Sequence, residues 1–309
     1  MKTMKTRRLG TMAGALALAA SILGAHTGAA FAQTAPRQGA AAYRFQSIIN
    51  PADPTFTQLL GINDQQTIAG YFGSGMPAAV HPNKGFTLTL PNSFTPENYP
   101  NSAQTQVIGI NNRGDTDGFY VDAAGATHGF LDRGGTFTTA DLPGTTFNQL
   151  LGLNNHGQEV GYFQDAAQQN HAYIRDAHGN FLVPPIPNSQ ATGINDQGVV
   201  VGFTQPVTTS QSSGFILRDD VVTILNYPGS TFTQALGENN QGQIVGTYND
   251  AQGNTHGFVY RNGAFRAVDV PGSTSTVVNG INNQGRIVGF YVDPKNNNNT
   301  VGFVGKPLS

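Results

Sequence analysis

Three carboxylic acids are candidates for chemistry because each interrupts a short apolar segment: Asp117, Glu159 and Glu238. Related segments elsewhere in the sequence carry aliphatic residues at the same positions. Two carboxylates whose surroundings push their pKa values apart can act as acid and base. Such a pair would suit a hydrolase or lyase that acts on an extracellular polysaccharide. The alternative is that these residues lie at the solvent-exposed ends of an imperfect repeat.

The relation between the segments comes from an internal repeat, which is clearest at residues 280–290, Gly-Ile-Asn-Asn-Gln-Gly-Arg-Ile-Val-Gly-Phe. The first Asn of this block recurs at spacings of 48, 43, 41, 44 and 43 residues. The six positions are Asn63, Asn111, Asn154, Asn195, Asn239 and Asn282. Repeats of this length without helical periodicity are typical of propeller blades. The sequence therefore predicts six structural units.

Four short strands are predicted in the fifth unit, at residues 234–239, 243–248, 256–260 and 264–270. Turns rich in Asn, Asp and Gly separate them, and Gly242 is free to take a positive φ. The sixth unit has only three strands, and residues 43–49 would supply the fourth. The predicted fold is all-β: a six-bladed β-propeller of four-stranded blades, closed by an N-terminal strand that completes the last blade.

In such a propeller the first strand of each blade lies beside the axis, where its glycine lets six backbones crowd together. Five glutamines three residues before that glycine are predicted to line the channel, with inter-blade hydrogen bonding as the alternative: Gln58, Gln106, Gln149, Gln190 and Gln234. Asp117 and Glu159 are one position apart in register. They therefore either face each other between blades 2 and 3 or both point away.

Sequence variation is concentrated on one face, which we call the loop face. It carries the loops between second and third strands and the connections between blades. Its variable segments are residues 91–103, 204–213 and 294–300. Binding is commonly carried by variable loops on a rigid scaffold. The predicted binding residues are therefore Glu97, Tyr99, Asp122 and Asp293, with neutral variation of exposed loops as the alternative.

Three of the predicted third strands begin with a shared motif: His128-Gly129-Phe130, His171-Ala172-Tyr173 and His256-Gly257-Phe258. With the Gly-Ile-Asn-Asn-x-Gly-x-Ile-Val-Gly block, this motif resembles the HAF-type repeat of bacterial extracellular proteins, over essentially all of residues 43–309. The resemblance implies an extracellular repeat protein and leaves its activity open. Three segments placed at the corresponding position lack the histidine: Pro77-Ala78-Ala79, Ser213-Gly214-Phe215 and Val301-Gly302-Phe303. A role that requires histidine in every blade is therefore not expected.

Composition and charge argue against several kinds of partner. Without the first 32 residues, 12 Lys and Arg stand against 18 Asp and Glu, a net charge of −6 that disfavours a nucleic-acid partner. There is no cysteine, so neither a disulfide nor a thiolate is available. No HxH or HExxH spacing and no calcium-loop pattern occurs, so neither a metal nor a cofactor is expected. A monomer is expected.

The N-terminus has the pattern of a secretory signal peptide. Basic residues precede an apolar run, and Ala30-Phe31-Ala32 forms a small-x-small cleavage site, so residues 1–32 are predicted to be removed. Residues 33–42 are predicted to be a disordered lead-in and residues 43–309 one propeller domain. No later segment is apolar enough to span a membrane. The expected protein is exported to the periplasm or beyond, and it is a non-catalytic scaffold that binds a glycan or a protein through its loop face.

Overall fold

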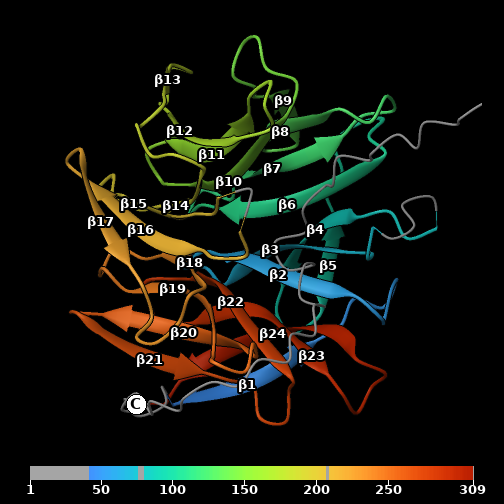
Figure 1. Ribbon diagram of the computed structural model, residues 1–309. Helices are drawn as coiled ribbons and strands as arrows, with labels where there is room; N and C mark the ends of the chain where they lie inside the picture. Colours follow the sequence, from blue (N-terminus) through green and yellow to red (C-terminus); the bar gives the residue numbers. More distant parts are fainter. Residues whose placement is uncertain (1–41, 76–79, 207–208, 309) are drawn as a thin grey trace, which may run out of the picture. The chain divides into compact units, whose positions relative to one another are not determined.

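Six blades arranged in a ring make up the part of the chain that the computed structural model describes, residues 42–75, 80–206 and 209–308 (Figure 1). Each blade is an antiparallel sheet of four strands, and no helix occurs within these ranges. The innermost strands contact each other in sequence order, and β22 (Ser275–Ile281) returns to β2 (Thr57–Ile62). The ring is therefore closed, and the predicted all-β six-bladed propeller is confirmed.

The first three blades are formed by strands that run outward from the axis in sequence order. Blade 1 contains β2, β3 (Thr67–Phe72), β4 (Lys84–Thr89) and β5 (Ser93–Pro96). Blade 2 contains β6 (Gln104–Ile110), β7 (Thr116–Val121), β8 (Thr127–Arg133) and β9 (Thr136–Thr139). Blade 3 contains β10 (Asn148–Leu153), β11 (Glu159–Gln164), β12 (Asn170–Arg175) and β13 (Phe181–Leu182).

The last three blades follow the same order, except that the outermost strand of blade 6 comes from the start of the domain. Blade 4 contains β14 (Ser189–Ile194), β15 (Val200–Thr204), β16 (Ser213–Arg218) and β17 (Val221–Leu225). Blade 5 contains β18 (Thr233–Glu238), β19 (Ile244–Asn249), β20 (Thr255–Arg261) and β21 (Ala264–Val268). Blade 6 contains β22, β23 (Ile287–Asp293), β24 (Asn299–Pro307) and β1 (Tyr43–Ile48).

The N-terminal strand closes the ring as predicted. β1 pairs antiparallel with β24, from Tyr43 opposite Pro307 to Ile48 opposite Gly302, and the two strands lie side by side in Figure 1. Phe45 packs edge-on against Phe303, with 5.5 Å between ring centroids. Strand pairing and aromatic packing thus join the two ends of the domain and cover the outer edge of β24, which would otherwise be unpaired.

The glycine of each innermost strand lies where neighbouring blades touch. A β-bulge precedes it in every blade, for example between Leu59 and Gly61. A Cβ added to Gly61 would lie 2.6 Å from the carbonyl oxygen of Ile108 in the next blade. A Cβ on Gly280 would lie 2.5 Å from the carbonyl oxygen of Leu60. Only glycine permits this approach, as the sequence predicted.

A second glycine, in the second strand of each blade, is covered by an aromatic side chain of the third strand. The six aromatic residues are Phe86, Phe130, Tyr173, Phe215, Phe258 and Phe303, and each is at most 1% exposed. In blade 1 this pairing places Gly70 opposite Phe86, so the counterpart of the His-Gly-Phe motif is Lys84-Gly85-Phe86. The predicted counterpart Pro77-Ala78-Ala79 was therefore wrong, because blade 1 has a longer loop before β4. Residues 77–79 themselves lie outside the described residues.

The predicted signal peptide, and the lead-in except for Ala42, lie outside the described residues. Within the ranges given above, no helix is long and apolar enough to cross a membrane.

Candidate functional site: an axial pocket

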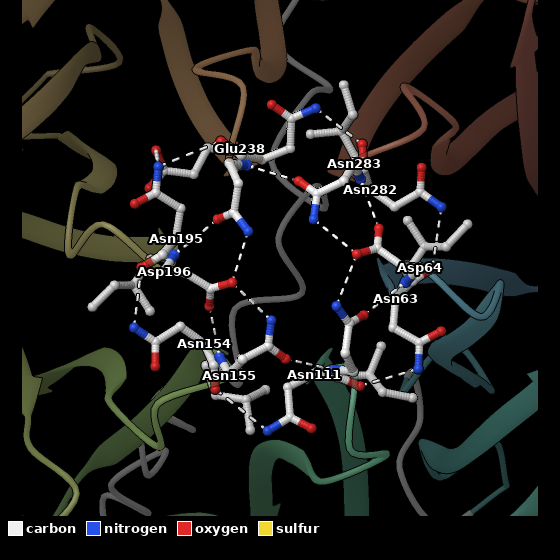
Figure 2. Close-up of a pocket in the computed structure, with 18 residues that line it drawn as sticks. Asn63, Asp64, Asn111, Asn154, Asn155, Asn195, Asp196, Glu238, Asn282 and Asn283 are labelled. Atoms are coloured by element: carbon white, nitrogen blue, oxygen red, sulfur yellow. Dashed lines mark hydrogen bonds between the residues drawn. The ribbon is translucent and has the colours of Figure 1, made fainter.

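A cavity of about 80 Å³ lies where the turns between first and second strands meet around the axis (Figure 2). We call this side of the ring the turn face. Each blade contributes three successive residues to the lining: 62–64, 110–112, 153–155, 194–196, 238–240 and 281–283. The first residue of each triplet ends the innermost strand, and the next two begin the turn. The repeat thus brings the same short segment to one place six times.

The first turn residue of each blade forms an outer ring of hydrogen bonds. Its members are Asn63, Asn111, Asn154, Asn195, Asn239 and Asn282. Each Nδ2 donates to the main-chain carbonyl of the equivalent Asn in the next blade, at 2.9–3.4 Å, and the ring closes from Asn282 to Asn63. Each Oδ1 accepts N–H groups of its own turn, as Asn239 does from Gln241 and Gln243. These six residues stabilise both the turns and the contacts between blades.

The second turn residue forms an inner ring. Its members are Asp64, Asn112, Asn155, Asp196, Asn240 and Asn283. The main-chain N–H of each donates to Oδ1 of the next member at 2.8–2.9 Å, around the whole circle. Because an amide oxygen accepts but cannot donate, this contact fixes the orientation of every Asn amide. The Nδ2 atoms and the second carboxylate oxygens therefore face the central opening (Figure 2).

The two carboxylates of the inner ring lie in opposite blades, 1 and 4. Asp64 Oδ2 accepts from the amides of Asn112 and Asn283, both at 2.8 Å. Asp196 Oδ2 accepts from Asn155 and Asn240 at 2.8 and 2.7 Å. Burial acts to raise the pKa of Asp196, but hydrogen bonds from Asn155 and Asn240 outweigh it and hold that pKa below its ordinary value. The opening is thus surrounded by two equivalent clusters, each a carboxylate between two amides.

Each inner-ring amide uses one of its two Nδ2 hydrogens on an aspartate, which leaves one N–H without a partner among the described residues. The opening therefore offers four N–H donors and two carboxylate acceptors to a ligand. Such an arrangement suits the binding of a small polar group. The outer-ring Asn residues define the sequence repeat, but neither ring was predicted to be a site. The available signal was polar residues at two successive positions in all six copies, beside the axis.

Asp117, on β7, is buried between blades 2 and 3 and is outside the axial pocket. Its side chain has no exposed surface. Oδ1 accepts the main-chain N–H of Gly109 at 2.8 Å, and Oδ2 has no hydrogen-bond partner. Burial, and to a smaller extent the charge of Glu159, raise the pKa of Asp117 well above its ordinary value, against the opposing contact with Gly109.

Glu159, on β11, lies in the same interface and pairs with two guanidinium groups. Its carboxylate oxygens are 2.6 Å from Arg175 Nη1 and 3.3 Å from Arg133 Nη2, and the side chain has no exposed surface. Burial raises the pKa of Glu159, and the two guanidinium groups oppose that shift. Arg133 belongs to blade 2, so both Glu159 and Asp117 face the interface. The interpretation of these residues as solvent-exposed repeat ends was wrong, because both are fully buried.

Glu238, the last residue of β18, replaces the aliphatic residue of the other blades. Asn195 Nδ2 donates to its Oε2 at 3.3 Å, and its Oε1 is buried without a partner. Burial raises the pKa of Glu238 well above its ordinary value, although the charge of Arg218 opposes this. The side chain therefore lies between blades 4 and 5 and turns toward Asn195 at the edge of the pocket (Figure 2). Of the three predicted catalytic carboxylates, Asp117 and Glu159 share the interface between blades 2 and 3, whereas Glu238 lies apart from them between blades 4 and 5.

On the loop face, Tyr99 packs as part of the scaffold. Its ring stacks on Tyr120 with 3.7 Å between centroids, and its hydroxyl is 2.8 Å from Thr139 Oγ1. Tyr227 stacks on Tyr248 in the same way, at 3.5 Å. In both places, an aromatic residue from the connection that leaves one blade is fixed on the second strand of the next blade. Tyr99 thus contributes to the contact between blades 1 and 2.

The other predicted binding residues also have hydrogen-bond partners within the protein. Glu97 accepts a hydrogen bond from the hydroxyl of Thr116, and burial raises the pKa of Glu97 to about 7 against the effect of that bond. Asp122 accepts the N–H groups of two residues in its own turn, and Asp293 accepts that of Lys295. Ligand binding through these four residues stays a prediction.

The motif histidines contact aspartates on the loop face. In two blades a histidine lies between two aspartates, and we call each cluster a clasp: Asp122–His128–Asp141 in blade 2 and Asp250–His256–Asp269 in blade 5. His128 Nδ1 is 2.7 Å from Asp141, and Nε2 is 3.5 Å from Asp122. Burial acts to lower the pKa of His128, but the two carboxylates outweigh it and raise that pKa. A clasp joins the loop before the third strand to the segment that leaves the blade.

The predicted channel glutamines are buried, with at most 7% of each residue exposed. Gln58 Oε1 accepts from the Tyr71 hydroxyl at 2.9 Å. Gln106 Nε2 donates to Asn83 Oδ1 in the preceding blade at 2.8 Å, which agrees with the inter-blade alternative. None of the five lines the axial pocket. Their place in a channel stays a prediction.

Comparisons with known proteins concern the fold. No protein-family model and no curated protein matches the sequence, so the HAF-type resemblance stays a prediction. A putative TolB from Agrobacterium tumefaciens is similar with a TM-score of 0.59 at 11% identity, over 86% of this chain and 100% of that chain. A gluconolactonase from Xanthomonas campestris gives 0.52 at 10%, over 86% and 90%. A mutant of AofleA from Arthrobotrys oligospora gives 0.53 at 10%, over 87% and 91%. Identities this low show the shared fold alone.

Proposed function

We propose that this protein is an exported, non-catalytic β-propeller that binds a ligand in the axial pocket of its turn face. The inner ring carries the proposal: six polar side chains from six blades converge on one opening, and four of their amides retain an N–H for a ligand. From the sequence, the loop face was predicted to bind a glycan or a protein. The geometry favours the axis because the polar groups converge there, whereas the predicted loop residues have partners within the scaffold.

A binding role is favoured over catalysis by the way the carboxylates are held. A general acid or base must come within hydrogen-bond reach of the substrate. Asp117 and Glu159 have no exposed surface from which to reach one. Asp64 and Asp196, at the opening, have both oxygens engaged by main-chain N–H or amide groups. Fixed acceptors of this kind are suited to orienting a ligand.

Export is supported by the N-terminal sequence. The basic residues, apolar run and Ala30-Phe31-Ala32 site have the order of a secretory signal peptide. A chain without cysteine gains nothing from an oxidising compartment, so its stability there depends on core packing and on ring closure. We therefore place the function in the periplasm or outside the cell.

Site-directed variants on the two faces test the proposal. Ligands that raise the unfolding temperature of the mature protein, from a panel of glycans and peptides, are titrated by calorimetry against wild type, Asp64→Asn and Asp293→Asn. We expect Asp64→Asn to weaken binding by about tenfold or more, equivalent to about 1.4 kcal/mol, and Asp293→Asn to leave it unchanged. Circular dichroism confirms that both variants fold. The reverse pattern would place the site on the loop face and overturn the proposal.

A further inference from the structure

We infer, resting on the proposed function, that the group bound in the inner ring is a neutral polyol, such as adjacent hydroxyls at the end of a glycan. The inference comes from the arrangement of hydrogen-bond donors and acceptors around the opening. Four amide N–H groups and two carboxylate oxygens face it, in the order amide, carboxylate, amide on each of two sides (Figure 2). A hydroxyl group can accept from an amide and donate to the neighbouring carboxylate at once.

A metal cation fits this arrangement poorly. Calcium takes six to eight oxygen ligands. The four amide oxygens of the inner ring instead accept main-chain N–H groups of neighbouring blades, so the amides direct N–H toward the centre. Oδ2 of Asp64 and Oδ2 of Asp196 are therefore the two inner-ring oxygens that face the centre, far fewer than calcium needs. In the part of the chain that the structure describes, no group of three His, Cys, Asp or Glu residues is placed to hold a metal.

An anion such as phosphate is disfavoured for a different reason. The four N–H groups would attract it, but the two carboxylates of the ring repel it. The pocket lining contains neither lysine nor arginine to compensate. Sites that bind phosphate or carboxylate groups usually rely on arginine, lysine or a helix N-terminus. A neutral group avoids both this repulsion and the cost of removing an ion from water.

The size and symmetry of the pocket limit how the ligand enters. A cavity of about 80 Å³ has room for several water molecules, so one edge of a sugar residue fits, while the rest of a chain remains outside. The clusters centred on Asp64 and Asp196 come from opposite blades, and each offers two amides beside a carboxylate. We therefore expect the bound residue to present hydroxyls on two sides, and a polar group with a single hydroxyl to bind weakly.

Nuclear magnetic resonance of the mature protein tests the inference directly. The ¹⁵N side-chain amide signals of Asn112, Asn155, Asn240 and Asn283 are followed during separate titrations with neutral monosaccharides, calcium chloride and inorganic phosphate. We expect at least one monosaccharide to shift these four signals, with an affinity that is unchanged by added salt, because a neutral ligand is not screened. The other two probes should leave the signals in place. The double variant Asp64→Asn/Asp196→Asn should weaken the sugar by about tenfold or more, since both acceptors are lost.

Each other outcome has a defined meaning. Shifts caused by calcium and lost in the double variant would replace the polyol with a cation. Shifts caused by phosphate and strengthened in the double variant would replace it with an anion. In either case the axial binding function stands and only the ligand chemistry is overturned. If no probe shifts the four amides while a ligand shifts the backbone signals of Asp122 or Asp293, both the inference and the axial site fail. Asp293→Asn, on the loop face and away from the pocket lining, serves as a folded control with an intact ring.

Discussion

The two faces of the propeller differ in how their side chains use the repeat. On the turn face, residues of the same type meet at the axis and bond from blade to blade, as Asn282 does to Asn63. On the loop face, several polar residues bond within their own blade, as Asp293 does to Lys295 and as the clasps do. The variable face thus carries local turn caps, whereas the uniform face carries the convergent polar site.

This difference follows from the geometry of a closed ring. A residue near the axis meets its own copies, so one repeated polar position becomes a ring of six. A residue far from the axis is separated from its copies by whole blades and finds partners nearby. Variation between copies marks the places where the fold imposes few constraints. In a closed repeat protein, a uniform polar position beside the axis is therefore as informative about binding as a variable loop.

The largest difference between the faces is expected for glycine substitutions. Gly280→Ala places a Cβ 2.5 Å from the main-chain oxygen of Leu60 in the next blade, and backbone must move to relieve it. We expect a loss of about 2–3 kcal/mol in the free energy of unfolding. Gly253→Ala, in a loop-face turn with φ of 83° and open space around it, should lose only about 1 kcal/mol. Urea denaturation measures both, and equal losses would show that contact at the axis is not tight.

A smaller difference is expected between two polar residues of blade 6. Asn282→Ala removes a buried acceptor for two turn N–H groups and the donor that bonds to Asn63 in blade 1. We expect a loss of about 2 kcal/mol. Asp293→Ala removes a turn cap that is only partly buried and should lose about 0.5 kcal/mol. Thermal and urea unfolding of the two variants give the comparison. If Asp293→Ala proved the more damaging, the inter-blade ring would not be the stronger constraint.

Asp117 belongs to neither face. Its substitution measures how a buried carboxyl group between two blades affects stability. Asp117→Val restores the aliphatic residue found at this position in blades 3 to 6 and removes a carboxylate oxygen that has no partner. We expect the free energy of unfolding to rise by about 1–2 kcal/mol. The lost hydrogen bond from the Gly109 N–H reduces this gain. Unchanged ligand affinity is expected in the same variant. A loss of affinity would return Asp117 to the functional residues.

Much of the scaffold was predictable because the repeat fixes it. The spacing of Asn282 and its copies predicted the blades, residues 43–49 were correctly assigned to the closing strand, and Gly242 has φ of 70° as its turn requires. The axial site was missed although polar residues occupy two successive turn positions in all six copies, because the packing of the blades around the axis decides that these side chains meet. The orientation of Asp117 and Glu159 was left open, and packing between blades decides it.

The smallest expected effect is a pH dependence that belongs to the loop face. The carboxylates around His128 and His256 raise the pKa of both histidines above the unfolded value of about 6.5. A raised pKa means that protonation favours the folded state. This contribution is complete below about pH 6.5 and is lost as the pH rises through the folded pKa values. Because both histidines are partly exposed, we expect only a few tenths of a kcal/mol from each.

Calorimetric unfolding temperatures between about pH 5.5 and pH 8.5 measure this effect. As the pH rises, the unfolding temperature of the double variant His128→Gln/His256→Gln should fall less than that of the wild type. Glu97 also makes the stability fall as the pH rises. Its pKa of about 7 in the folded protein exceeds the ordinary value of 4.5, so ionisation of this carboxyl destabilises the folded state as the pH approaches 7. Glu97→Gln is therefore measured in parallel, to separate the two sources. A decline that persists in full without Glu97 and both histidines would require a titrating group elsewhere. Glu238→Gln would then show whether the buried carboxyl between blades 4 and 5, whose pKa burial raises, contributes to the decline.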